Sequence, residues 1–307
     1  MRLEVPITED SGVAISGTLF VPALSWRNPL TTLVIAVPGG SYDRSYWHLM
    51  VPGLDGYSFA EKMVDSGYMV FALDNLGTGS SHRPTDPTTV TVETMADAVS
   101  MTARRLATMI AEGMLGPRER PARVRLIVVG HSLGAQIAVA AQARNETFEA
   151  VGVFGGSFIS ANPGDIAGDI ANARTGLGLI TQNSIDDGYL NLSRDLVRGL
   201  FHADDVPDAV MTEEARHATV MPLAAAIQAL APVTIAEYPR RVAVPVFLAF
   251  GDVDTSPDPD GESRLYARSP TVASFRVAGS AHCHNASSNR HLLWTAWLAW
   301  LETLHGR

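Results

Sequence analysis

The sequence predicts an α/β protein in which helices cover both faces of a mostly parallel sheet. Short, nearly continuous apolar runs recur along the chain, and longer stretches with apolar residues at helical spacing lie between them. Runs without polar alternation are typical of strands that are buried on both faces. Strands that alternate with helices indicate parallel pairing through right-handed crossovers.

The first half of the chain predicts an edge hairpin followed by alternating strands and helices. Residues 2–7 and 13–21 carry apolar residues on either side of Asp10-Ser11-Gly12, which indicates a hairpin at the sheet edge. The patterns that follow predict strands at 32–37, 69–73, 124–129 and 149–154, and helices at 58–66, 93–112 and 135–141.

Residues 157–240 interrupt this rhythm. They hold helix-like stretches at 186–201 and 221–230, joined by acidic, proline-containing connections that we interpret as solvated. We therefore expect a core made of residues 1–156 and 241–307, with a helical insertion between them. The core pattern returns in the last part of the chain, with strands at 244–250 and 272–277 and helices at 261–268 and 287–304.

Composition excludes several classes of protein. The 307 residues are 46% hydrophobic and 18% charged, as in an ordinary globular protein with a sizeable core. A net charge of -9 argues against nucleic acid or an anionic membrane as a partner. No apolar run is long enough to span a membrane, and MRLEVPITEDSG lacks the apolar core of a signal peptide. A single cysteine, Cys283, excludes an internal disulfide and favours the cytoplasm.

A G-x-S-x-G motif follows the strand predicted at 124–129. It reads Gly130-His131-Ser132-Leu133-Gly134, and a helix is expected directly after it. The motif could arise by chance in a loop, but a strand before it and a helix after it give it the context of a nucleophile elbow. We therefore predict that Ser132 is a nucleophile, exposed at the start of a helix.

Two further strand ends carry the partners that a serine nucleophile needs. Asp252 and Asp254 follow the strand at 244–250, and His282 follows the strand at 272–277. Ligands bind at the carboxyl ends of strands in such sheets, so we expect these groups to meet Ser132 there. A histidine would take the serine proton and return it to the leaving group, while a carboxylate holds the imidazole. We favour Asp254, with Asp252 as the alternative.

An oxyanion hole needs two backbone N–H groups. One is expected from Leu133, the residue after the nucleophile. The other is expected from Gly40, or alternatively Ser41, in the turn that ends the strand at 32–37. Without a binding partner in view, Pro38-Gly39-Gly40 is also consistent with an ordinary tight turn.

Other residues near these motifs offer weaker alternatives. His284 competes with His282 as the base, and Cys283 suggests a thiol nucleophile that no elbow presents. The pair His282 and His284 lacks a clear third metal ligand, so we expect no metal. The glycine-rich loop 74–80 lacks the pattern of a nucleotide site, and we expect no cofactor.

Together these motifs resemble the α/β-hydrolase superfamily, outside residues 157–240. The resemblance rests on GHSLG (130–134), the D-x-x-G-x-G-S stretch at 74–80, GDVD (251–254) and GSAH (279–282). It implies an eight-stranded, mostly parallel sheet, a Ser–His–Asp triad, and a helical cap inserted after strand six, here residues 157–240. One difference is that the family often has His-Gly at the oxyanion turn, where this chain has Pro38-Gly39-Gly40.

The resemblance implies an esterase- or lactonase-like serine hydrolase. The serine at the elbow differs from the aspartate of dehalogenases and epoxide hydrolases of this fold. We expect hydrolysis of an ester, lactone or related carbonyl bond in a mainly apolar small molecule. C–C bond hydrolysis, acyl transfer and a receptor that retains the triad remain alternative functions. A homodimer is a possible assembly. The candidate substrate-binding residues are Ser41, His131, Phe158, Phe201 and Met221; for His131, a packing role inside the elbow is the favoured interpretation.

Overall fold

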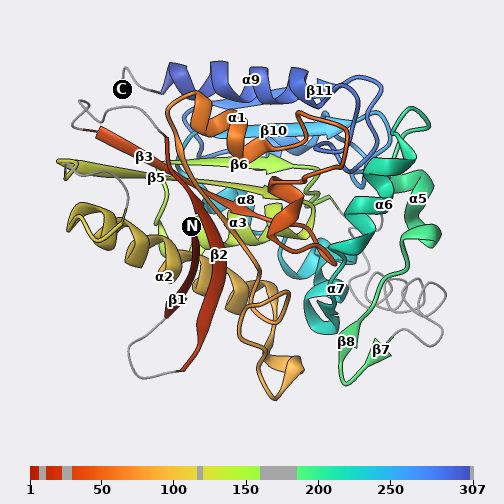
Figure 1. The fold of residues 1–307 in the computed structure, drawn as a ribbon, viewed down its shortest axis with the longest axis horizontal. Helices are drawn as coiled ribbons and strands as arrows, with labels where there is room; N and C mark the ends of the chain where they lie inside the picture. The colour runs from red at the N-terminus through yellow and green to blue at the C-terminus, as the bar shows by residue number, and fades with distance from the viewer. Residues whose placement is uncertain (7–11, 23–29, 116–119, 160–184, 305–307) are drawn as a thin grey trace.

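An eight-stranded sheet forms the centre of the computed structural model, which describes residues 1–6, 12–22, 30–115, 120–159 and 185–304 (Figure 1). The strands from β4 to β11 are parallel, while β1 and β2 form the predicted antiparallel edge hairpin. From one edge to the other, the order is β1 (Arg2–Pro6), β2 (Ala14–Phe20), β4 (Met69–Leu73), β3 (Leu30–Val37), β5 (Arg123–His131), β6 (Ala150–Phe154), β10 (Val246–Gly251) and β11 (Val272–Val277).

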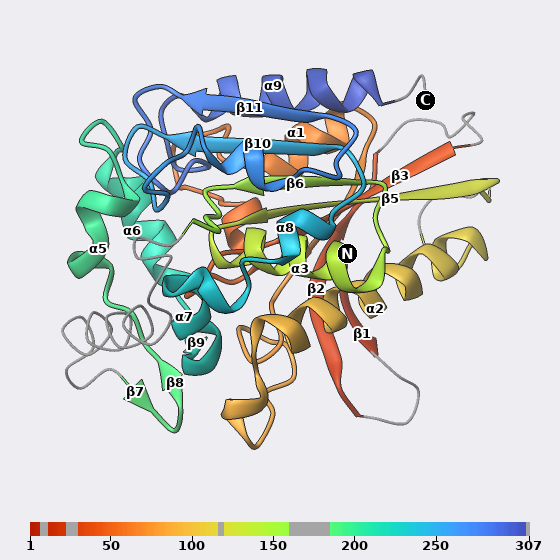
Figure 2. The same ribbon diagram turned by 180° about the vertical axis from the view of Figure 1, so that it is seen from behind.

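Helices cover both faces of this sheet, which confirms the predicted fold class (Figures 1 and 2). Successive side chains of β3 point to opposite faces of the sheet. Leu33 and Ile35 belong to one buried apolar cluster, and Val34 and Ala36 belong to the other. On the first face lie α2 (Val92–Ala111), α3 (Leu133–Asn145) and α8 (Tyr238–Arg241); on the second lie α1 (Phe59–Asp65) and α9 (Arg290–Thr303).

Side chains that cap free backbone N–H groups mark the starts of α1 and α2. Thr91 and Thr94 form a reciprocal capping box at the start of α2, and Ser58 accepts the N–H of Glu61 at the start of α1. Within the described residues, no helix is both long and apolar enough to cross a membrane.

Apart from α8, the described part of the segment between β6 and β10 lies toward the carboxyl ends of the strands (Figures 1 and 2). It combines helices with a small sheet, ordered β7-β8-β9. Its described elements are β7 (Ile185–Asp186), β8 (Tyr189–Leu190), α5 (Arg194–Phe201), α6 (Asp208–Arg216), β9 (Met221–Pro222), α7 (Leu223–Leu230) and the 3-10 helix η3 (Pro232–Thr234).

Two of the predicted helices are shorter than expected. Residues 185–190 form a hairpin and α5 begins only at Arg194, because Asp187 (φ 45°) and Gly188 (φ 76°) both adopt the positive φ of a tight hairpin turn. The helix predicted over 261–268 is only the 3-10 helix η4 (Glu262–Leu265), since the chain leaves the helix at Tyr266, whose side chain is buried in the core. Further 3-10 helices are η1 (Arg44–Trp47) and η2 (Pro87–Thr89).

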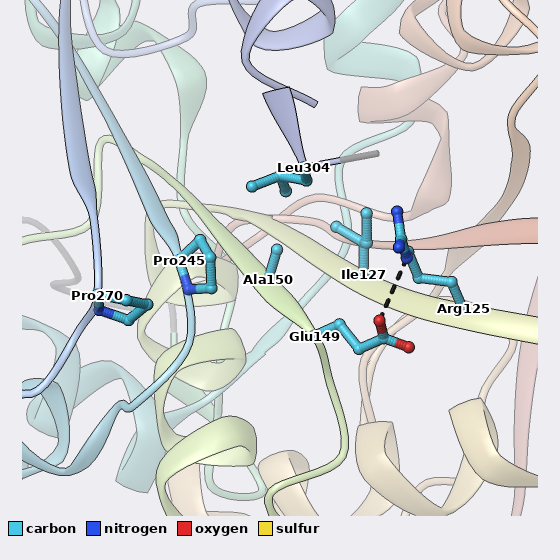
Figure 3. A pocket seen from close by; sticks show the side chains of 7 residues that line it. All are labelled: Arg125, Ile127, Glu149, Ala150, Pro245, Pro270 and Leu304. Carbon is cyan, nitrogen blue, oxygen red and sulfur yellow. Dashed lines mark hydrogen bonds and ion pairs between the residues drawn. The ribbon is translucent and has the colours of Figure 1, made fainter. Parts of the chain in front are cut away.

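A pocket of about 190 Å³ lies at the amino ends of the strands, beside the ion pair between Arg125 and Glu149 (Figure 3). Pro245 and Pro270 line it just before β10 and β11 begin. Ser132 follows the opposite end of β5, about 20 Å away at 3.3 Å per strand residue. This pocket is therefore separate from the sequence-predicted site.

Candidate active site

Ser132 occupies a strained turn between β5 and α3. Its φ of 55° and ψ of -124° lie where residues other than glycine are rarely found. The turn needs two glycines: a Cβ on Gly130 would collide with the backbone of Gly134, and one on Gly134 would collide with the carbonyls of Val37 and Pro38. Ser132 is partly exposed, whereas its neighbours His131 and Leu133 are buried.

Asp254 and His282 form a buried pair just after the carboxyl ends of β10 and β11. His282 donates its Nδ1–H to Oδ1 of Asp254 at 2.6 Å. The backbone N–H groups of Gly251 and Thr255 also donate to this carboxylate, each at 2.8 Å. Gly155 makes room for the pair, because a Cβ there would lie 3.0 Å from Nδ1 of His282. The bond to Asp254 leaves Nε2 of His282 as the acceptor.

Asp252, the alternative acid, lies elsewhere. It is exposed and accepts the backbone N–H of Gly279 at 2.7 Å, which braces the loop before His282. The structure thus brings Asp254, and not Asp252, to the histidine.

His284 binds the second oxygen of the same carboxylate. Its Nε2 lies 2.9 Å from Oδ2 of Asp254, and both side chains are buried. Burial by itself raises the pKa of the Asp254 carboxyl, but the hydrogen bonds from His282 and His284 outweigh burial and hold that pKa well below its ordinary value. Asp254 is therefore ionised and held in place from both sides.

His131 supports the loop that carries His282. Its Nε2–H donates to the carbonyl of His282 at 2.8 Å, and its ring stacks on Tyr46 with centroids 4.3 Å apart. The side chain is 0% exposed. No part of the ring faces solvent and its donor nitrogen is already used, so His131 has the position of a packing residue and not of the candidate substrate contact.

The buried His131 predicts a loss of stability in mild acid. Burial lowers the pKa of His131 well below its ordinary value, and the nearby His282 and His284 lower it further. The unfolded chain therefore takes up a proton below about pH 6.5 that the folded chain refuses, so the free energy of unfolding falls by up to about 1.4 kcal/mol per pH unit.

Urea unfolding of the wild type and of His131→Gln, measured at about pH 7.5 and about pH 5.5, checks this sign. Glutamine keeps a donor near the Nε2 position and does not titrate. The variant should lose less stability between the two pH values, and equal losses would contradict the assignment.

The turn after β3 carries the candidate oxyanion donors. The Nδ2–H of Asn75 donates to the carbonyl of Pro38 at 2.9 Å and fixes the turn to the loop after β4. A Cβ on Gly40 would collide with Sδ of Met221 and would lie 3.5 Å from Leu133. Leu133 is the first residue of α3, where a backbone N–H has no partner within the helix. The turn and the start of α3 therefore face each other.

Ser41 is held by an arginine that the sequence analysis did not single out. Arg194, on α5, donates to Oγ of Ser41 at 2.8 Å and to its carbonyl at 2.6 Å. Its guanidinium lies 4.0 Å above the ring of Tyr42. Ser41 has a φ of 62° and is 1% exposed. Because its hydroxyl already accepts a hydrogen bond from Arg194, the side chain is not free to bind a substrate. No local motif marks Arg194, which comes from a distant part of the chain.

The remaining predicted residues lie around this site. The ring of Phe201 is 5.6 Å from that of His282, and Met221 packs over Gly40. Phe158 is buried in the same apolar cluster as Leu133 and Met221, and its backbone N–H donates to Glu262.

Cys283, the alternative nucleophile, is enclosed beside the site. It is 2% exposed and lies 3.1 Å from the hydroxyl of Tyr42. Burial raises the pKa of this thiol well above its ordinary value, which argues against a thiolate nucleophile.

Solved structures share the arrangement of the whole chain. The carboxyl esterase of Bacillus coagulans aligns with a TM-score of 0.68 at 14% identity, covering 99% of this chain and 98% of that one. The esterase of Thermogutta terrifontis aligns with a TM-score of 0.67 at 15% identity, covering 99% of both chains. The enol-lactonase of Burkholderia xenovorans gives 0.60 at 15% identity, covering 94% and 97%. At these identities the likeness shows the fold alone.

The sequence itself places the chain in a family. No curated protein sequence matches it. Residues 34–293 match the model of the alpha/beta hydrolase family, which covers most of the sheet, its helices and the segment after β6. On this match, the chain belongs to the alpha/beta hydrolase family.

Proposed function

We propose that the protein is a serine hydrolase that cleaves an ester or lactone bond in a mainly apolar small molecule, through an acyl-enzyme on Ser132. One observation carries the proposal: a buried His282–Asp254 pair, joined at 2.6 Å, follows the carboxyl ends of β11 and β10, and a strained, partly exposed serine follows the carboxyl end of β5 in the same sheet. Three strand ends thus supply the three residue types that nucleophilic acyl transfer needs.

In the proposed reaction, Nε2 of His282 removes the proton of the Ser132 hydroxyl as the oxygen attacks the carbonyl carbon. The imidazolium that forms is stabilised by the ionised Asp254 and returns the proton to the leaving alcohol. Water then repeats the sequence: His282 takes its proton as the water oxygen attacks the acyl carbon, the bond to Ser132 breaks, and His282 returns the proton to the Ser132 oxygen as the acid is released.

The backbone N–H groups of Leu133 and Gly40 are the proposed oxyanion donors. Leu133 begins α3, so the positive end of the helix dipole adds to its hydrogen bond. Each such donor is worth about 3 kcal/mol of barrier in comparable sites. Gly40 is preferred to Ser41 because Arg194 and Thr219 already hold Ser41 in a buried position.

We propose that residues 157–240 act as a cap that selects the substrate; residues 160–184 of it lie outside the described part of the chain. Phe201 and Met221 bring apolar surface to His282 and Gly40, which supports a mainly apolar substrate. The solved esterases and the enol-lactonase of the same fold support an ester or lactone bond. The lone cysteine supports a reducing compartment, and we propose the cytoplasm.

Arg194 is proposed to fix the oxyanion turn to the cap. Arg194→Gln removes the two hydrogen bonds from the guanidinium to Ser41. We expect kcat to fall by about 10-fold to 100-fold, the cost of misplacing a catalytic group by about 1 Å. Arg198→Gln is the matched control, because Arg198 is on the same helix and pairs only with the exposed Asp208 in the described structure. Steady-state kinetics of both variants test this prediction. Equal kcat values for Arg194→Gln and Arg198→Gln would contradict the role of Arg194 in positioning the oxyanion turn.

A panel of chromogenic esters and lactones tests the proposed function. Turnover with a burst of one product equivalent, absent in Ser132→Ala, is the expected result. Inertness toward every ester and lactone would overturn the proposed bond type. Cleavage of a C–C substrate, transfer to an added alcohol, or tight ligand binding without turnover would then identify the alternative.

A further inference from the structure

A second cluster of reactive side chains lies beside the candidate site and is not used by the proposed reaction. His202 ends α5, Glu214 lies on α6, and Cys283 follows His282 in the loop after β11. All three are buried, and one ligand atom from each lies within 4.8 Å of the other two. A nitrogen, an oxygen and a sulfur thus converge from three separate elements.

The contact between His202 and Glu214 is an ion pair when the imidazole is protonated, but it lacks the geometry of a hydrogen bond. Nε2 of His202 lies 2.7 Å from Oε2 of Glu214, and each side chain is 5% exposed. Oε2 nevertheless has no hydrogen-bond partner of adequate geometry among the described residues. A buried carboxylate oxygen in this position is costly unless something else binds it.

The charges of the cluster match a divalent cation. Glu214 contributes a carboxylate, and a metal ion that displaces the proton of Cys283 would create a second negative charge in the same enclosed space, which a dication neutralises. Arg194 is the nearby positive group, but its guanidinium is engaged by Ser41 and the ring of Tyr42. The Tyr42 hydroxyl, 3.1 Å from Sγ of Cys283, offers an oxygen next to the thiol.

We propose that His202, Glu214 and Cys283 form a zinc site that clamps the cap to the loop carrying His282. Histidine, carboxylate and thiolate are the ligands that Zn²⁺ takes in proteins, and the fourth position falls to the Tyr42 hydroxyl or a water molecule. Binding releases the thiol proton to solvent and forms the Zn–S bond. The site does not use His282 or His284, which both bind Asp254.

The clamp would strengthen an existing junction. The N–H of His282 donates to the carbonyl of Leu200 at 3.0 Å, and the N–H of Cys283 donates to that of Phe201 at 2.9 Å. The end of α5 therefore already lies along the histidine loop, and the ion would add α6 to the same point. Its role is structural and is independent of the proposed hydrolysis.

Cobalt substitution tests the site directly. The full chain is treated with a chelator, desalted and titrated with Co²⁺ while its near-ultraviolet and visible absorption are recorded. A thiolate-to-cobalt charge-transfer band that saturates at about one ion per chain is expected for one site with a sulfur ligand. Because Cys283 is the only cysteine, this band reports on no other site. Zn²⁺ should displace the cobalt and raise the unfolding temperature.

Three variants and one control decide the outcome. Cys283→Ser should abolish the band, while His202→Gln and Glu214→Gln should weaken cobalt binding by at least about 10-fold, since even residues behind metal ligands contribute about 10-fold to 100-fold. Glu213→Gln is the matched control, because its carboxylate pairs with Arg216 on the same helix and not with the cluster. Circular dichroism verifies that each variant is folded.

Two results would overturn the proposal. One is the absence of a charge-transfer band in the wild type at a several-fold excess of cobalt. The other is a band that persists unchanged in both His202→Gln and Glu214→Gln, which would reduce the site to a thiol that meets cobalt alone. If Cys283→Ser fails to fold, these two remaining variants decide the matter.

Discussion

Asp254→Asn is expected to lower kcat by about 10⁴-fold, the loss seen when the acid of a comparable triad becomes an amide. The amide cannot accept from both histidines as the carboxylate does, so His282 is left in the wrong tautomer and its protonated form loses a buried counter-charge. Single-turnover hydrolysis of the best ester found in the panel measures the loss.

Asp252→Asn is the matched control. This side chain lies two residues away, is exposed, and accepts one N–H from Gly279. A single exposed hydrogen bond is worth about 1 kcal/mol, so less than a 10-fold loss is expected. A larger loss in Asp252→Asn than in Asp254→Asn would contradict the assignment of the acid.

Gly130→Ala is expected to destabilise the fold by at least about 3 kcal/mol, at the upper end of the cost of overpacking. The new Cβ would collide with the backbone of Gly134, which cannot rotate away as a side chain can. Because β5 is a central strand, the displacement would reach both the sheet and α3.

Gly199→Ala provides the opposite control. A Cβ at this position on α5 meets no heavy atom within 4 Å. Alanine in a helix interior is favoured over glycine by about 0.8–1 kcal/mol, so a small gain is expected. Chemical denaturation of both variants gives the comparison, and a Gly130→Ala protein as stable as the wild type would contradict the described turn.

Much of the fold could be predicted because its signals are local. The buried strands of a parallel sheet are continuous apolar runs, and β4 was predicted with the bounds that the structure gives it. The edge hairpin was predicted from the turn residues between β1 and β2. The pattern over 186–201 predicts one helix, but Asp187-Gly188 is a turn signal inside it, and the structure forms the hairpin of β7 and β8 there.

The sequence predicts which residues lie near the site, because each of them follows a strand of the parallel sheet, but it does not predict their contacts. Parallel strands place Ser132, the 252–254 loop and His282 at one edge, but the choice between Asp252 and Asp254 depends on how that loop folds. Arg194 and the cluster around Cys283 have no local pattern at all. Their partners come from elements that only tertiary packing brings together.

Covalent labelling of Ser132 tests the central claim most directly. The wild type and Ser132→Ala are each treated with a fluorophosphonate, and the intact mass of each protein is measured before peptide mapping. We predict that the wild type gains one label, mapped to Ser132, and that the variant gains none. An unlabelled wild type, or a label that Ser132→Ala retains, would contradict the proposal that this serine is the nucleophile.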